Sequence, residues 1–345
     1  MSCAIAGPPY WGWCRKVRRK WEAMMRGLIW VTVILAGLWG GWWVVGSRGA
    51  KAAAEGWLAE RGRYDSLSVA GFPSRIDLTV TGLELDDPAS GIGWRTPFAQ
   101  VFAMTWKPWH LIAALPGGQE FSLPGGKVTF DGTGMMGSVL MVPGGDLALS
   151  EAVVQGADLR LTPGFGVLTG AEKAVGSIRR DETRTHGYRL GLNVASLAVA
   201  PEWAARAGLP AVVDEVFFDA DLTLSAPIDR HLERSRPAPQ AVKLTAARVN
   251  WGELRVFAKG ALAADAAGFA EGKIDIRVEN WRLLPPALVA AGVIGAGFEP
   301  ALTRGLEVMA ESGQEQDVLT LPLVAKGGGM SLGPLPLGAA PLWRP

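Results

Sequence analysis

Three histidines and a few carboxylates are the residues of this sequence whose types could support acid–base or metal chemistry. His110, His186 and His231 lie far apart, and none belongs to an H-E-x-x-H or H-x-x-E-H arrangement that would place metal ligands on one helix face. Asp219 and Asp221 could form a carboxylate pair, but they alternate with apolar residues and are expected on the solvated face of a strand. The sequence therefore predicts no metal site and no catalytic residue.

Two glycine-containing segments resemble nucleotide-binding loops. Gly132, Gly134 and Gly137 spell G-x-G-x-x-G, but residues 138–142 continue with strand character, whereas a dinucleotide site needs a helix there to hold the pyrophosphate. We interpret these glycines as a flexible turn after a strand at 127–130. The segment from Gly268 to Lys273 has three residues between its glycines where a P-loop has four, and it lacks the magnesium-binding Ser or Thr. No cofactor is expected.

The remaining signals also argue against an enzyme. Cys3 and Cys14 both precede the hydrophobic segment described below, so the rest of the chain has no thiol for catalysis or for a disulfide. No G-x-S-x-G elbow is present. An unrecognised hydrolase remains an alternative that requires histidine and carboxylates to converge in a polar pocket. The net charge of +1 lacks the positive field that nucleic-acid binding requires, so we expect no nucleic-acid partner.

A membrane-spanning helix is the clearest prediction from the sequence. Residues 27–46 read GLIWVTVILAGLWGGWWVVG and, as a helix, would span roughly 30 Å, the thickness of a bilayer's hydrocarbon core. Six basic residues and only one acidic residue, Glu22, lie between residues 15 and 26. The positive-inside rule then places the N-terminus in the cytoplasm and the rest of the chain across the membrane. A cleaved signal peptide is the alternative, but its apolar region is usually shorter.

Aromatic residues mark the outer end of this segment. Trp39, Trp42 and Trp43 cluster there, and indole rings favour the headgroup level of a bilayer. Gly37 and Gly41 form a G-x-x-x-G pattern, which leaves pairing with a second helix open. The predicted anchor comprises Gly27, Leu28, Ile29, Trp30, Val33, Ile34, Leu35, Leu38, Trp39, Trp42, Trp43, Val44 and Val45.

The sequence divides into four regions around the predicted span. They are a cytoplasmic tail at 1–26, the transmembrane helix at 27–46, an Ala-rich helical stalk at 47–63 and a β-rich periplasmic domain at 64–345. Translation starting at Met24 or Met25 is an alternative that would make the residues before Met25 an extension. Residues 226–240 contain three prolines among charged residues, and a linker there would divide the domain into two lobes.

Alternating polarity predicts strands throughout the large domain. Residues 75–80 alternate with period two, and the apolar register then changes around Gly82, where a bulge is expected. The same alternation returns at 216–224, 254–262 and 273–279. Pro-Gly-Gly turns at 116–118, 124–126 and 143–145 separate short strands, as expected for an antiparallel meander. The charged run 179–186 is predicted to be an exposed loop.

Helices beyond the stalk are expected to be few and short. Residues 201–208 begin with proline and end with glycine, which favours one short helix. Pro285 and Pro286 can open another that continues to about Ile294. The apolar stretch 287–298 is too short to cross a bilayer, and we expect it to be buried in the domain.

Three stretches carry a family resemblance. They read GFPSRIDLTVTGLELDDP at 71–88, WRTPFAQVFAMTWKPWHLIAALP at 94–116 and GGMSLGPLPLGAAP at 328–341. In sequence and order these resemble domain of unknown function 2125, a family of uncharacterised Gram-negative envelope proteins. Position 109 is Trp where Asn is common in that family. No catalytic residues come with the resemblance, and its motif residues are expected to be structural: Gly71, Phe72, Pro73, Arg75, Asp77, Pro97, Pro108, His110, Gly333 and Pro334.

The order of elements is similar, more distantly, to that of AsmA-type envelope proteins, whose curved sheets are thought to shield lipid chains. The expected fold is therefore mainly β, with an N-terminal transmembrane helix followed by an elongated, curved antiparallel β-sheet domain and a few short helices. An apolar concave face would bind lipid or partners. We expect a single-pass protein of the bacterial inner membrane that holds or passes lipid or assists envelope assembly. The alternative is a scaffold that recruits another envelope protein.

Overall fold

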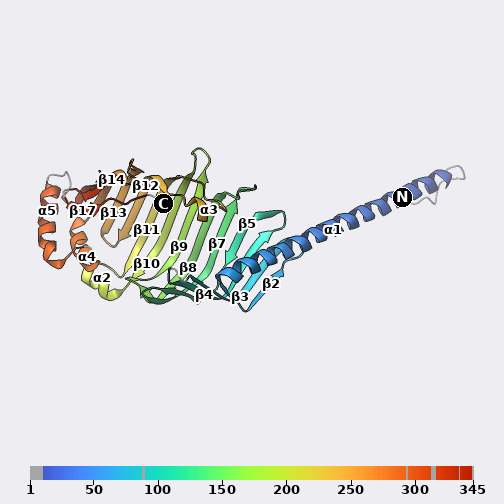
Figure 1. The fold of residues 1–345 in the computed structure, drawn as a ribbon, viewed down its shortest axis with the longest axis horizontal. Helices are drawn as coiled ribbons and strands as arrows, with labels where there is room; N and C mark the ends of the chain where they lie inside the picture. The colour runs from blue at the N-terminus through green and yellow to red at the C-terminus, as the bar shows by residue number, and fades with distance from the viewer. Residues whose placement is uncertain (1–10, 88–89, 293, 312–315, 334, 344–345) are drawn as a thin grey trace.

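The computed structural model describes residues 11–87, 90–292, 294–311, 316–333 and 335–343. The predicted span and stalk are parts of one long helix, α1 (Trp11–Arg61), which projects from one end of the molecule (Figure 1). Its segment Met24–Arg61 is long and apolar enough to cross a membrane, and the most apolar part of this segment is not buried in the protein. Cys3 and part of the predicted tail lie outside the described residues.

The rest of the chain is mainly β-strand, as the alternating pattern predicts. The strands are β1 (Gly62–Arg63), β2 (Ser66–Ala70), β3 (Arg75–Asp87), β4 (Ile92–Met104), β5 (Lys107–Ala114), β6 (Gln119–Leu123), β7 (Gly126–Met141), β8 (Leu149–Phe165), β9 (Leu168–Asp181), β10 (Gly187–Val199), β11 (Val212–Leu224), β12 (Pro239–Trp251), β13 (Leu254–Ala264), β14 (Ala270–Glu279), β15 (Val318–Lys326), β16 (Gly329–Leu332) and β17 (Leu335–Ala339).

These strands form one 17-stranded sheet with a simple meander topology, in which the strands pair antiparallel. Most strands pair with their neighbours in sequence, while β5 and β6 share the space between β4 and β7. Residues 225–238 connect β11 to β12, and because these two strands pair with each other the sheet continues without interruption past this segment. The three Pro-Gly-Gly turns lie between strands as predicted.

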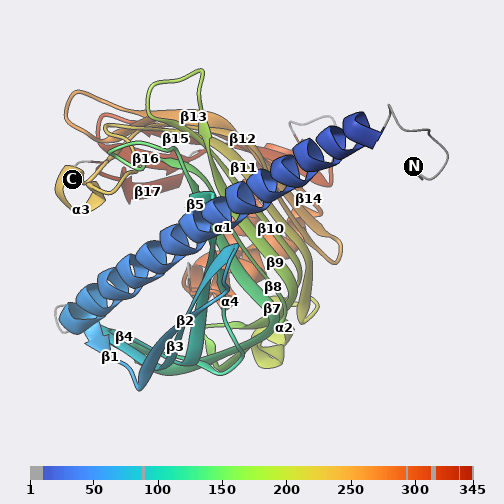
Figure 2. The same ribbon diagram turned by 90° about the vertical axis from the view of Figure 1, so that its right-hand side faces the viewer.

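The sheet is elongated and strongly curved. Its strands are stacked along the long axis of the molecule in Figure 1, and the view along that axis in Figure 2 shows each strand bending around a common interior. The right-handed twist of neighbouring strands accumulates over a long meander and favours such curvature. The expected fold class is confirmed, including the elongated, curved antiparallel sheet.

Five short helical segments besides α1 lie between described strands. They are α2 (Pro201–Ala207), α3 (Leu232–Ser235), the 3-10 helices η3 (Trp281–Leu283) and η4 (Ala296–Phe298), and α4 (Leu284–Ala290), and a longer helix, α5 (Glu299–Glu311), follows η4. The predicted helix at 201–208 is confirmed, with Gly208 in the left-handed conformation at its C-terminus. The helix opened by Pro285 and Pro286 ends at Ala290, earlier than predicted.

Two expectations for the sheet need correction. The glycines of the G-x-G-x-x-G pattern do not form a turn between two strands, because β7 runs continuously from Gly126 to Met141. Gly134 has a φ of +57°, and the pairing of β7 with β8 shifts register on both sides of Thr133. The charged run predicted as a loop begins inside β9, so Arg179 pairs with the neighbouring strands and only residues 182–186 form the connection.

Candidate functional site

The two faces of the sheet differ sharply in chemistry, and one of them is apolar along its whole length. One row of directly paired residues crosses every strand from β2 to β15 except β6, without a polar side chain. Its members, in order, are Val69, Leu78, Val101, Ala113, Gly137, Val154, Gly176, Leu192, Phe218, Ala247, Ala258, Ile276 and Leu321.

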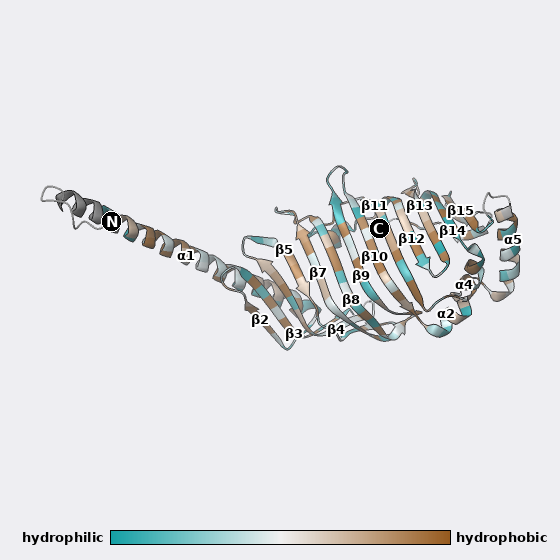
Figure 3. Cartoon of the chain, turned by 180° about the vertical axis from the view of Figure 1, so that it is seen from behind, coloured by the Kyte–Doolittle hydropathy of each residue, from teal (hydrophilic) through white to brown (hydrophobic). Residues whose placement is uncertain are grey.

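A second row beside the first has the same character. It crosses from β3 to β16, again without β6 and without a polar side chain, through Ile76, Ala103, Leu111, Val139, Ala152, Ile178, Leu190, Ala220, Leu244, Gly260, Ile274, Leu323 and Leu332. In Figure 3 the apolar residues, coloured brown, alternate with hydrophilic ones along the strands. The period-two alternation predicted from the sequence is therefore in phase from strand to strand.

This apolar face lies on the inside of the curve. Helix α4, which packs against the face with Ala287, lies within the curved sheet in Figure 2. Because the rows run across the strands, they run along the length of the sheet. With neighbouring strands about 4.8 Å apart, a row from β2 to β15 is roughly 55–60 Å long. The sheet thus has an apolar inner face that extends over most of the domain.

Helices cover the inner face at its far end, where it forms the main core. Trp203 of α2 and Leu306 of α5 are buried there against Val278 and Leu319. Trp281 is fully buried, and its indole nitrogen donates a hydrogen bond to the carbonyl oxygen of Gln316 at 3.0 Å. This part of the inner face is an ordinary protein core.

The last turns of α1 cover the inner face at the other end. Leu58 is 3% exposed and forms a small core with Val80, Leu83 and Ala99. Gly82 has a φ of +57°, and Val80 and Leu83 both reach this core, which is the change of apolar register that the sequence predicts. This part of the inner face is also covered.

The middle of the inner face is covered only along one edge, where Leu149, Tyr188 and Leu224 form a small core against Ala152 and Ile178 of the second row. The rest of the middle has no such cover. Val154 is 61% exposed, Leu192 is 40% exposed and Val139 is 37% exposed, although all three belong to the apolar rows. Gly176 lies between Val154 and Leu192 and leaves the surface between them open. A β-carbon at Gly176 would lie 3.3 Å from Val154 Cγ2 and 3.9 Å from Leu192 Cδ1. Between the two covered ends, the inner face therefore presents an exposed apolar surface around Val139, Val154 and Leu192.

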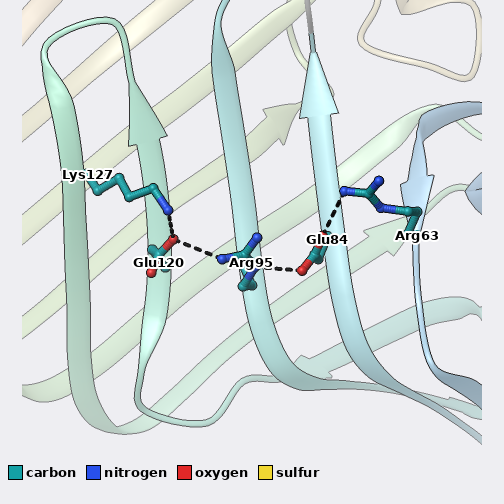
Figure 4. Close-up of polar contacts among 5 residues, drawn as sticks. All are labelled: Arg63, Glu84, Arg95, Glu120 and Lys127. Atoms are coloured by element: carbon teal, nitrogen blue, oxygen red, sulfur yellow. Dashed lines mark hydrogen bonds and ion pairs between the residues drawn. The ribbon is translucent and has the colours of Figure 1, made fainter.

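Charged side chains occupy the opposite, outer face. Figure 4 shows a ladder that crosses five strands: Arg63 contacts Glu84, Arg95 contacts both Glu84 and Glu120, and Lys127 contacts Glu120, at distances of 2.8–3.3 Å. The hydrogen bonds from Arg95 and Arg63 hold the pKa of Glu84 below its usual value. The same ion pairing raises the pKa of Arg95, and Lys127 lowers that of Glu120.

Further ion pairs continue on the outer face around the middle strands. Arg189 donates two hydrogen bonds to Asp219, which lowers the pKa of that carboxyl group. Arg184 contacts Asp221 at 3.1 Å. The two aspartates that could have formed a carboxylate pair therefore have separate arginine partners. The outer face carries these paired charges among apolar side chains such as Phe102, Ile112 and Phe217, and its charged groups contact water as expected for one side of a sheet.

The three histidines do not converge. His110 shares a hydrogen bond with Ser138 of the neighbouring strand β7 at 2.9 Å. His231 lies 3.7 Å from the exposed Asp146, and His186 occupies the turn between β9 and β10 with a φ of +50°. Within the described residues, no group of three or more histidine, cysteine and acidic side chains is arranged to hold a metal ion.

The motif residues gather mostly at the end of the sheet near α1. Gly71, Phe72 and Pro73 form the turn between β2 and β3, and Arg75 contacts Asp77 at 2.6 Å in β3. The others are Pro97 in β4, Pro108 and His110 in β5, and Gly333 after β16, while Pro334 lies outside the described residues. The predicted anchor residues all lie on α1.

The sequence indicated an apolar face in individual strands, but it did not indicate that these faces join into one continuous surface. Alternation within one strand says which residues share a face, and the register between strands decides whether those faces align. The indole contacts of Trp39, Trp42 and Trp43 were also missed. These side chains were predicted to lie in the headgroup region, but their nitrogens donate hydrogen bonds to backbone carbonyls of the β2–β3 and β4–β5 ends of the sheet.

Comparison with known proteins supports the resemblance seen in the motifs. Residues 43–341 match the family described as an uncharacterized protein conserved in bacteria (DUF2125). No curated protein matches the chain significantly. Because the family match covers most of the chain, from near the C-terminal end of the apolar segment of α1 almost to the C-terminus, the chain belongs to the DUF2125 family of uncharacterized bacterial proteins.

Proposed function

We propose that this protein is a non-enzymatic, membrane-anchored envelope protein that holds lipid acyl chains on the inner face of its sheet and passes them along it. The observation that carries the proposal is the pair of apolar rows that run the length of the sheet, with Val139, Val154 and Leu192 exposed in its middle. Exposed apolar surface of this extent marks an interaction site in soluble domains.

The dimensions of the inner face favour hydrocarbon chains as the occupant. A bilayer's hydrocarbon core of about 30 Å contains two leaflets, so one acyl chain extends roughly 15 Å. A strand spacing of about 4.8 Å makes each row roughly 55–60 Å long, which is several times the length of one acyl chain. Covering one exposed Val or Leu side chain with hydrocarbon is worth up to about 1.5–3 kcal/mol. The open side of the curve leaves polar headgroups in water.

The charges around the anchor support the proposed placement in the envelope. Basic residues precede the apolar segment of α1, and the positive-inside rule then puts the sheet on the periplasmic side of the bacterial inner membrane. The bilayer is both the anchor and the nearest source of acyl chains. In this arrangement the apolar inner face begins next to α1 and leads away from the membrane.

Two glutamate substitutions at adjacent positions test the proposal. Val154 lies on the inner face, and Val153 pairs with Ser138 and Ser177 on the outer face of the same strand. We expect Val154→Glu to lose most of the phospholipid that copurifies with the full-length protein in mild detergent, as measured by native mass spectrometry. Val153→Glu should retain it. Absence of bound lipid in the unsubstituted protein would contradict the proposal, as would equal loss in both variants.

A scaffold function is the alternative, and the last strand favours it. β17 pairs with β16 and presents its other edge at the end of the sheet, with Leu337 48% exposed. A sheet edge can add a strand from a partner through main-chain hydrogen bonds. An envelope protein that crosslinks to residues 336–339 in cells would support this function. Binding of lipid to the inner face does not depend on the scaffold function.

A further inference from the structure

The outer end of the predicted membrane span is attached to the sheet by its tryptophans. The indole nitrogen of Trp39 donates to the carbonyl oxygen of Pro73 at 2.8 Å, and that of Trp43 donates to Arg75 at 2.6 Å. The indole nitrogen of Trp42 reaches the carbonyl oxygen of Thr105 at 3.4 Å. Two turns of the sheet, at residues 71–74 and 105–106, therefore lie beside the helix at the level of these tryptophans.

Large apolar side chains are exposed on these two turns. Phe72 is 62% exposed even though its ring contacts Trp43 edge-on, with 5.3 Å between centroids. Trp106 is 56% exposed and Met104, just before the turn, is 39% exposed. Trp42 of the helix is 58% exposed in the same region. A helix and two turns together present a belt of aromatic and apolar side chains, the composition found at membrane–water interfaces.

The length of the helix decides where this belt lies in a membrane. Residues 24–38 are all exposed, and the hydrogen bonds between α1 and the sheet begin at Trp39. The uncharged part of this free segment, residues 27–38, spans only about 18 Å at about 1.5 Å per residue, against a hydrocarbon core of about 30 Å. The part of the hydrocarbon core that residues 27–38 do not span must be crossed either by residues 39–46, to which the turns are attached, or by residues before 27.

Extending the span toward the N-terminus brings charges into the hydrocarbon. To reach about 27 Å without residues 39–46, the span would have to begin near Trp21 and enclose Glu22 and Arg26. Charged groups within the bilayer are costly, by about 2.5–3.5 kcal/mol each at the centre and less near the ends. Using residues 39–46 instead immerses tryptophan, glycine and valine, together with the apolar tips of the two turns. Arg75, which is paired with Asp77, and Lys107 follow these tips at the starts of β3 and β5.

We propose that the β2–β3 turn and the β4–β5 turn insert into the outer leaflet of the membrane that α1 spans, with Phe72 and Trp106 in its acyl region. Arg48 and Lys51 follow on α1 at the headgroup level, where they face lipid phosphates. Gly46 of α1 lies against Ile76, the first member of the second apolar row. The inner face of the sheet therefore begins at the leaflet surface. This inference rests on α1 as the anchor and does not require lipid on the inner face.

Spin labels placed at single cysteines test the insertion. The background variant carries Cys3→Ser and Cys14→Ser in the full-length chain, reconstituted into phosphatidylcholine and phosphatidylglycerol vesicles. Labels at Trp106→Cys and Phe72→Cys should collide more with oxygen, which concentrates in hydrocarbon, than with a water-soluble nickel chelate. The matched control is Ile92→Cys, which is also an exposed apolar residue, 48% exposed, but lies at the opposite end of β4. Its label should collide mainly with the nickel chelate.

Three outcomes would overturn the insertion. Labels at 72 and 106 that behave like the label at 92 would place both turns in water. Labels protected from both reagents would place the turns against protein, such as a second copy of the chain. A label that enters hydrocarbon at 92 would mean that the assay reports nonspecific adsorption. Lipid copurification, measured separately, can fail while the labels at 72 and 106 still report hydrocarbon, so the two proposals are judged independently.

Discussion

The far end and the middle of the inner face are built from the same strand pattern but have different surroundings. At the far end, Val278 and Leu319 are buried beneath α2, α4 and α5. In the middle, Val154 and Leu192 occupy equivalent inward positions and remain exposed. The comparison shows that inward alternation alone does not make a core, because a covering element is also needed. Apolar residues that the chain leaves uncovered contribute little to its stability and suit a function in binding.

The largest expected difference between the two regions comes from placing a charge in each. Val278 is 1% exposed, so Val278→Glu buries a carboxylate without a partner and should cost roughly 4 kcal/mol or more, enough to prevent stable folding. Val154→Glu places its carboxylate at an exposed position and should change the unfolding free energy by less than about 1 kcal/mol. Urea denaturation in detergent measures both.

A milder substitution keeps this comparison measurable if Val278→Glu does not fold. Val278→Ala should lose about 1.5–3 kcal/mol, the value of burying one such side chain, while Val154→Ala should lose much less. Equal losses at the two positions would mean that something covers the middle of the inner face as well.

The next largest effect is expected at the fully buried tryptophan of the far end. Trp281→Ala removes a side chain with 0% exposure and leaves a cavity, which should lower the unfolding free energy by about 3–5 kcal/mol. Trp281→Phe keeps most of the volume but loses the hydrogen bond to Gln316, and should lose less than the alanine variant. Thermal unfolding, monitored by near-ultraviolet circular dichroism, measures the order of stability of the unsubstituted protein and the two variants. A reversed order would contradict this account of the core.

Filling the middle of the inner face should affect binding more than stability. Gly176→Leu adds a side chain next to Val154 and Leu192, which are both exposed, so the longer side chain can extend into open space beside them. Stability should stay the same or rise slightly, because glycine within a strand is unfavourable. The lipid retained per protein molecule should fall, as measured by phosphorus content after detergent exchange. Gly145→Leu, in the open connection between β7 and β8 with no neighbour within 4 Å, is a control for the effect of a new apolar side chain on lipid retention.

Most of the fold was predicted from the alternating polarity of the strands and from the turn-forming residues between them. Ile274, Ile276 and Val278 alternate with charged residues, and they form β14 with the inward face that the pattern predicts. Helix α5 was missed, although Leu302, Leu306 and Ala310 recur every four residues and form its buried face. A continuous strand through Gly132, Gly134 and Gly137 was missed as well, because glycine is a stronger signal for turns than for strands.

The candidate site was less predictable than the fold, because it depends on distant pairs. The apolar rows require the register of each strand with its neighbour, and that register is set by turns and bulges along the meander. The bond from Trp39 to Pro73 joins residues 34 positions apart in sequence. An aromatic cluster at the end of an apolar segment is typical of a membrane interface, and nothing in the local sequence indicates that the same side chains also hold two turns of a sheet.

The smallest expected effect lies on the outer face and depends on pH. The pKa of Asp181 is lowered from 3.8 to about 2, chiefly by hydrogen bonds from the hydroxyl and backbone N–H of Thr183 and then by Arg184. A carboxyl group with a depressed pKa in the folded state stabilises the fold above its unfolded pKa, and this contribution is lost as pH falls from about 4 to about 2. Asp181→Asn should therefore lower the melting temperature slightly at pH 7. The difference between the two proteins should shrink as the pH approaches 2, while lipid retention at pH 7 stays unchanged because the outer face does not contact acyl chains. A difference that stays constant with pH would mean that the aspartate acts through its shape alone and not through its charge.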